Sequence, residues 1–224
     1  MGLASLIDKV FAGGLGRLEE QNAAQHVDLA PLPAEISIAG EQVALRPVEA
    51  GDRDALLAFA RSLPEYDLAF LLVDITKPEG VDDWLREVAA GRYATLVACA
   101  GPEIVGSATV AASDMPWKRH VAELRMMLVP RMRGKGLGRL LAQQSFAIAE
   151  ERGIRKMTAH MTTDQEAAIH TFEKMGFERE AVLRGEVKDA DGRLHDLQIM
   201  ALDADQFRTR LAVARNASTS SGIV

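Results

Sequence analysis

The sequence of 224 residues contains a single cysteine, Cys99, which excludes a disulfide framework within the chain and a thiolate-rich metal site. The five histidines show no metal-ligand spacing. No apolar run approaches the ~20 residues that span a bilayer, and the opening segment has neither a secretory core nor a myristoylation signal. The net charge of −6 gives no basic footprint for nucleic acid and mildly favours cationic small molecules. We therefore expect a cytoplasmic protein that binds no metal, nucleic acid or membrane.

What remains is the composition of a globular protein, with 48% hydrophobic and 26% charged residues, enough for one domain with terminal segments. Residues 1–34 predict a helical extension and a linker that ends in Pro31-Leu-Pro33. We expect the folded domain over residues 35–203. A C-terminal helix and a disordered Ser/Thr-rich tail are expected over 204–224.

Hydrophobic periodicity predicts an α/β (α+β) domain, a mixed sheet covered by helices. Strands are expected in a hairpin around Ile36–Leu45 and then over 93–100, 103–111, 120–129, 156–161, 180–187 and 194–202. Helices are expected from Asp52 to before Pro64, and over 78–91, 136–152 and 165–175.

The segment Val129–Gly138 lies between a predicted strand and a strongly amphipathic predicted helix. Its three glycines, 134, 136 and 138, allow backbone N–H groups to approach an anion, and the helix that follows adds the positive end of its dipole. Neither the dinucleotide fingerprint nor the P-loop pattern is met. The segment therefore predicts a phosphate-binding turn, although a plain tight turn between strand and helix explains the same glycines.

At this point the sequence resembles the GCN5-related N-acetyltransferase (GNAT) superfamily. Its pyrophosphate signature, Arg/Gln-x-x-Gly-x-Gly/Ala, is matched by Arg133, Gly136 and Gly138, and residues 168–177 are similar to a second family segment. The resemblance implies a mixed, mostly antiparallel sheet with splayed fourth and fifth strands, of which the strand before the turn carries a bulge. It also implies transfer of an acetyl group from acetyl-CoA to an amine by direct attack in a ternary complex.

The resemblance implies a set of cofactor contacts along the strand end, the turn and the post-strand helix. An N–H of Met127 or Leu128 is expected to donate to the thioester oxygen. The full set is Met127, Leu128, Val129, Arg131, Arg133, Gly134, Lys135, Gly136, Leu137, Gly138, Arg139, Gln165 and Phe172.

A protonated amine cannot attack a thioester, so a carboxylate near the cleft is the usual remedy. Glu123, on the strand before the turn, is our candidate for the catalytic base. An ion pair with Arg125 or Arg119 on a solvated face explains the same residue equally well. Asp164 is a weaker candidate that also fits a helix cap.

One position departs from the family pattern, because Phe172 stands where a proton-donating tyrosine is common and Gln165 where an asparagine is common. This departure motivates an alternative function, a non-catalytic acyl-CoA-binding or sensing module. Tyr66 and Trp117 are candidates to contact the acceptor, a small-molecule amine or a protein or peptide amine, although a role as a loop anchor explains Trp117 as well. The N-terminal helix would allow a homodimer.

Overall fold

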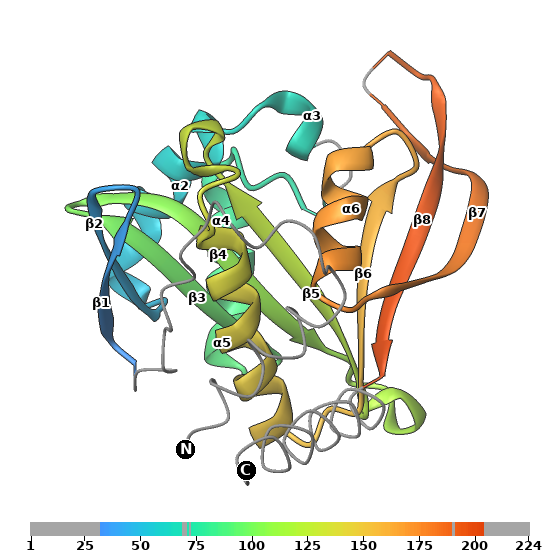
Figure 1. Cartoon of the computed structure of the whole chain (residues 1–224), viewed down its shortest axis with the longest axis horizontal. Helices are drawn as coiled ribbons and strands as arrows, with labels where there is room; N and C mark the ends of the chain where they lie inside the picture. The colour runs from blue at the N-terminus through green and yellow to red at the C-terminus, as the bar shows by residue number, and fades with distance from the viewer. Residues whose placement is uncertain (1–31, 69–70, 72, 190, 204–224) are drawn as a thin grey trace, which may run out of the picture.

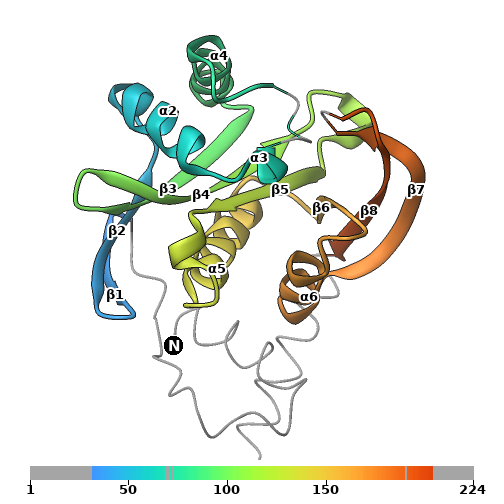
Figure 2. The same cartoon turned by 90° about the horizontal axis from the view of Figure 1, so that it is seen from above.

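One eight-stranded sheet lies between two layers of helices in the computed structural model, which describes residues 32–68, 71, 73–189 and 191–203. Helices α2, α3 and α4 cover one face of the sheet, and α5 and α6 cover the other (Figures 1 and 2). The helices expected before residue 32 and after residue 203 fall outside the described residues. No helix in the described part of the chain is long and apolar enough to cross a bilayer.

The strands follow the order β1-β2-β3-β4-β5-β6-β8-β7 across the sheet. Every neighbouring pair is antiparallel except β5 and β6, which run parallel. The strands are β1 (Ala34–Ile38), β2 (Glu41–Pro47), β3 (Tyr93–Ala100), β4 (Glu103–Ala112), β5 (Val121–Leu128), β6 (Lys156–Thr162), β7 (Glu178–Lys188) and β8 (Leu194–Asp203). The expected mixed, mostly antiparallel sheet is confirmed.

Each helix begins and ends where its sequence provides a signal. Pro78 opens α4 at the first helical position, where its missing N–H costs nothing, and Gly136 and Gly153 bracket α5. The helices are α2 (Arg53–Ser62), α3 (Glu65–Leu68), α4 (Pro78–Ala89), α5 (Leu137–Glu151) and α6 (Glu166–Lys174), with 3₁₀ turns η1 (Ala50–Asp52), η2 (Pro116–Lys118) and η3 (Pro130–Met132). The one-turn helix α3 was not expected from the sequence.

The centre of the sheet is buried on both sides because β3 and β4 contact helices from both layers. On β4 the residues from Ile104 to Ala111 are all buried, as a strand between two helical layers requires. The α4 side holds a buried polar chain in which Trp84 Nε1 donates to Thr95 Oγ1 at 3.0 Å and Thr95 bonds Thr109 Oγ1 at 2.9 Å. This chain satisfies polar groups that burial would otherwise penalise.

Candidate active site

The parallel pair β5 and β6 separates partway along its length. Pairing is limited to Val121–Glu123 opposite Lys156–Thr158, whereas β5 stays paired with β4 as far as Leu128 and β6 with β8 as far as Thr162. The two strands therefore open into a V, lined by residues 124–128 of β5 and 159–162 of β6. They are the fifth and sixth strands of the described chain, whereas the resemblance implied that the fourth and fifth would splay. Figure 1 shows them together at the lower end of the sheet and diverging toward α3.

The phase of the β4–β5 ladder decides which backbone groups of β5 face the V. Val129 N–H donates to the carbonyl of Val105 at 3.1 Å, so the odd-numbered residues of β5 bond to β4. The N–H groups of Met126 and Leu128 consequently point into the V, while those of Met127 and Val129 point toward β4. The sequence analysis expected the N–H of Met127 or Leu128 to donate to the thioester oxygen. The orientation of β5 favours Leu128 over Met127 for this role, and it makes Met126 a further candidate donor.

The bulge that the resemblance implied for this strand is absent. The register from Gly106 opposite Leu128 to Ala112 opposite Ala122 runs without a shift, and the register shift that involves β4 lies in its pairing with β3, at Ala98/Cys99 of β3. Because no extra residue interrupts β5, the alternation of its backbone groups continues to the end of the strand. This regular ladder is why Met126, and not Met127, has its N–H in the V.

The glycine turn stands at the open end of β5. After η3, Gly134 has φ +69° and Gly136, the N-cap of α5, has φ +93°, a conformation that side-chain-bearing residues rarely adopt. A Cβ at either glycine would meet no atom within 4 Å, so open space lies in front of the turn. The first turn of α5 adds backbone donors with no partner in the helix and its positive dipole end. The turn has the features of an anion site.

The side chains of the turn divide between the V, the core and solvent. Arg133 reaches back to the V, where Nε and an Nη donate to the carbonyl of Leu128 at 3.2 and 3.1 Å, and it also pairs with Asp67 of α3. Arg131 turns instead toward Glu103, at 2.6 Å, and Glu41. Lys135 is exposed and Arg139 is half-buried, whereas the side chain of Leu137 is fully buried and leaves only its backbone for a ligand.

Glu123 lies where the two strands begin to separate, and its carboxylate is held by Arg125. Arg125 Nε and an Nη donate to the two carboxylate oxygens at 2.9 and 2.8 Å, and another Nη donates to Tyr93 Oη at 3.2 Å. Burial by itself would raise the pKa of the Glu123 carboxyl, but the hydrogen bonds and charge of Arg125 outweigh it, so the pKa lies below its ordinary value. Glu123 is therefore ionised at neutral pH, and both of its carboxylate oxygens are bonded to Arg125.

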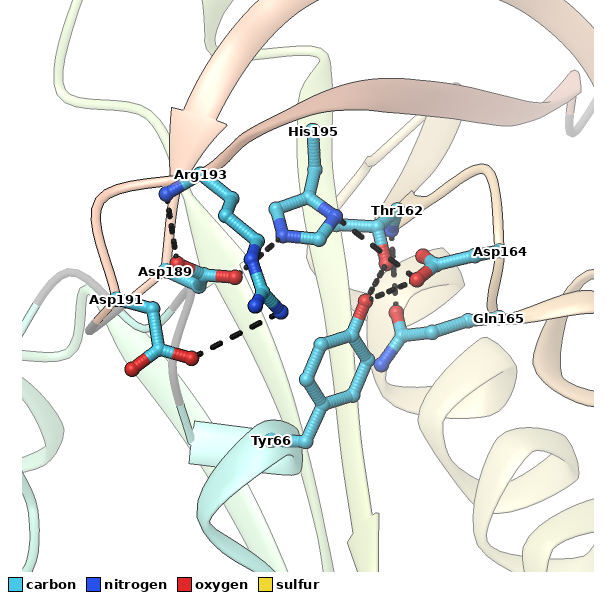
Figure 3. A network of polar contacts seen from close by, with 8 residues as sticks. All are labelled: Tyr66, Thr162, Asp164, Gln165, Asp189, Asp191, Arg193 and His195. Atoms are coloured by element: carbon cyan, nitrogen blue, oxygen red, sulfur yellow. Dashed lines mark hydrogen bonds and ion pairs between the residues drawn. The ribbon is translucent and has the colours of Figure 1, made fainter.

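A second group of polar side chains, drawn in Figure 3, lies at the far end of β6, on the side of the sheet that α3 covers in Figure 2. Tyr66 of α3 donates to Asp164 Oδ2 at 2.5 Å and bonds Thr162 Oγ1 at 3.1 Å. His195 of β8 bonds Asp189 at 2.8 Å and lies 3.8 Å from Asp164. Hydrogen bonds from Thr162 and Tyr66 hold the pKa of Asp164 below its usual value. The group ties α3 to β6 and to the β7–β8 hairpin.

Three further residues predicted to contact the cofactor or the acceptor, Gln165, Phe172 and Trp117, lie in different surroundings. Gln165 accepts a hydrogen bond from Thr162 N–H at 3.1 Å, so its side-chain oxygen is used at the edge of β6. Phe172 is buried against Phe177, with ring centroids 5.0 Å apart in an edge-to-face contact. Trp117 is 73% exposed in η2, before β5 begins, at the closed end of the V. The structure does not bring Trp117 to the open end.

Two residues of the site escaped the sequence reasoning. His160 of β6 places Nδ1 3.8 Å from Glu123 Oε1, and Asp67 pairs with Arg133. Strand alternation puts His160 on the same face as Thr158, but only the parallel register identifies Glu123 as its neighbour across the strands. Among the described residues, no cluster of three His, Cys, Asp or Glu side chains is arranged to hold a metal ion.

Comparison with known proteins agrees with this geometry. The family model described as Acetyltransferase (GNAT) family matches residues 55–177, which include the V, the glycine turn and α6. The chain belongs to the GNAT acetyltransferase family. The resemblance inferred from the glycine motif is thereby confirmed.

Individual relatives of this GNAT chain are distant. The match to YwnH of Bacillus subtilis is 32% identical over 85 residues and covers 38% of this chain but only 52% of that protein. The L-amino acid N-acyltransferase MnaT of Escherichia coli is 30% identical over 128 residues, 55% of this chain and 72% of the relative. The structure of yncA from Salmonella typhimurium with its cofactor acetyl-CoA shares the fold, with a TM-score of 0.63, 23% identity, and coverage of 73% of this chain and 94% of that one.

Proposed function

We infer that this protein is an acetyl-CoA-dependent N-acetyltransferase that moves the acetyl group to a primary amine within a ternary complex. The observation that carries the inference is the V itself, whose unpaired backbone edge leads from the glycine turn to a half-buried, ionised glutamate. Membership of the GNAT family and the relatives whose names describe N-acylation support the same reaction.

The donor would lie along the V with its diphosphate at the turn. Gly134, Gly136 and the start of α5 offer backbone donors to the diphosphate, and Arg133 adds a positive charge beside them. The N–H groups of Met126 and Leu128, which face the V, would bond the pantetheine arm and the thioester oxygen. Acetyl-CoA supplies an activated acyl group as a thioester, and these residues hold it in place.

The acceptor would approach from the α2–α3–α4 side, because Glu123 and Arg125 share the face of β5 that Thr109 and Ala111 occupy on β4. The negative charge of Glu123 attracts a cationic amine to this face of β5. Direct attack fits the chain's single thiol, because Cys99 is buried in β3 and burial raises its pKa, which makes it a poor nucleophile. A small amine is favoured by the relative named as acting on L-amino acids.

The leaving thiolate receives no proton from Phe172, which has no donor and packs against Phe177. A thiol with a pKa of about 8.5 is an acceptable leaving group as its anion, and solvent can protonate it. The missing donor is also the observation that favours the alternative function, a module that binds acyl-CoA without transferring the acyl group.

The test is thiol release from acetyl-CoA with a panel containing L-amino acids, spermidine and lysine peptides, alongside calorimetry of CoA binding. We expect Glu123→Gln to lower turnover at least tenfold without weakening CoA binding. Glu87→Gln is the matched control, since Glu87 also pairs with an arginine, Arg92, outside the V. CoA binding with no transfer to any amine would support the non-catalytic module. Unchanged turnover in Glu123→Gln would show that Glu123 has no catalytic role.

A further inference from the structure

The point where β5 and β6 separate carries a histidine as well as a glutamate. Glu123 and Thr158 form the last paired position, and His160, two residues further along β6, projects from the same face as Thr158. His160 Nδ1 lies 3.8 Å from Glu123 Oε1, and its side chain is 36% exposed against 25% for Glu123. The imidazole is thus the more accessible of two basic groups at the start of the V.

Glu123 itself is poorly suited to accept a proton. Arg125 donates to both of its carboxylate oxygens, at 2.9 and 2.8 Å, so protonation would disrupt two charge-assisted hydrogen bonds. Those bonds also lower the pKa of Glu123, and a weaker base takes a proton from the attacking nitrogen less readily. The arrangement is better suited to fixing a negative charge than to exchanging protons.

We propose that His160 accepts the proton of the attacking amine and that Glu123, held by Arg125, orients the imidazole and stabilises its charged form. This assignment rests on the proposed acetyltransferase function. Histidine is the side chain that most often acts as a general base in enzymes. Across β6, the neighbour of His160 on β8 is the apolar Ile199, and on the β5 side the charged groups are Glu123 and, behind it, Arg125.

In the proposed step the nitrogen of the neutral amine, which has already lost its ammonium proton to solvent, forms a bond to the thioester carbonyl carbon while His160 removes one proton from that nitrogen. The carbon–sulfur bond then breaks, and its electron pair leaves on sulfur. The thiolate takes a proton from His160 or from solvent, which returns the imidazole to its neutral form. The products are the amide and the free thiol, with no other reactant consumed.

The test compares wild type with His160→Gln over pH 5 to 9, using whichever amine of the panel is acetylated fastest. We expect kcat/KM at pH 8 to fall about a hundredfold or more in the variant. The ratio of wild type to variant should shrink toward acid pH, because a protonated imidazole cannot accept the proton of the amine. Because both proteins meet the same amine, its own protonation cancels in this ratio.

His170→Gln is the matched control, because His170 is also exposed and lies 3.7 Å from a glutamate, Glu173, but on α6. It should keep wild-type kcat/KM at every pH. Imidazole added to His160→Ala should restore part of its activity, which a purely structural role for His160 would not allow. CoA affinity and melting temperature should match wild type in the His160 variants.

Acetyl transfer that is undiminished in His160→Gln would overturn the assignment and leave the proposed function intact. If the loss of kcat/KM in His160→Gln is the same at every pH from 5 to 8, and imidazole does not restore activity to His160→Ala, the assignment is wrong. The general base would then be a group that is ionised throughout that range, such as Glu123. Absence of transfer in the wild-type protein would overturn the proposed function, and this assignment with it.

Discussion

Replacing Gly136 tests the anion turn most directly. At φ +93° any other residue takes up a left-handed conformation that costs about 1–2 kcal/mol, and the open space around its Cβ adds no clash. Gly136→Ala should therefore lower the melting temperature by roughly 2–8 °C. Gly136→Glu should destabilise the protein no more than Gly136→Ala does, because a carboxylate at the start of α5 interacts favourably with the helix dipole.

Binding of CoA should separate these two variants. A glutamate at residue 136 would hold a unit negative charge about 5 Å from the diphosphate, a repulsion on the order of 3 kcal/mol at an effective dielectric constant of about 20. That energy corresponds to about a hundredfold loss of affinity, which isothermal titration calorimetry resolves.

The matched control for this charge is Gly91→Glu. Gly91 also has a positive φ, +75°, with open space around its Cβ, but it lies between α4 and β3, away from the V. We expect Gly91→Glu to lower the melting temperature similarly and to leave CoA affinity unchanged. If Gly136→Glu binds CoA within twofold of wild type, the diphosphate does not lie at this turn, and the inferred site is refuted.

Other perturbations follow from individual contacts. Asp67→Asn releases Arg133 and should tighten CoA binding up to about fivefold by calorimetry, because an exposed ion pair is worth at most about 1 kcal/mol; weaker binding would mean that Asp67 positions Arg133. The pKa of Asp52 is lowered chiefly by its hydrogen bonds from Arg46, so its stabilisation is present above the ordinary value of 3.8 and is lost as pH falls below it. The difference in melting temperature between wild type and Asp52→Asn should be constant from pH 8 to about 5 and shrink below about 4, and a gap that persists to the most acid pH would contradict this. Ser107 Oγ is buried without a hydrogen-bond partner, so urea unfolding should show Ser107→Ala unchanged or more stable, whereas Thr109→Val should lose about 1–2 kcal/mol; a large loss in Ser107→Ala would reveal an unrecognised partner.

Most of the described fold could be predicted from the sequence because its signals are local. The glycine at 136, the amphipathic run to Glu151 and the stop at Gly153 determine α5 without reference to the rest of the chain. The same holds for the strands, whose predicted ends lie within two residues of the observed ones from residue 93 onward. Helix α3 was missed because four residues carry no periodicity.

The candidate site likewise has features that follow from local sequence and features that depend on long-range pairing. The sequence by itself determined the glycine turn, because a φ beyond +60° at residues 134 and 136 strongly favours glycine, which stands at both positions. The sequence also placed Glu123 on the strand before that turn. Only the tertiary structure decided the phase of β5 and the position at which β5 leaves β6, because each depends on pairing between segments that are distant in the chain. That pairing brings His160 to Glu123 and turns Met126, instead of Met127, toward the V, and no local pattern in the sequence encodes either result.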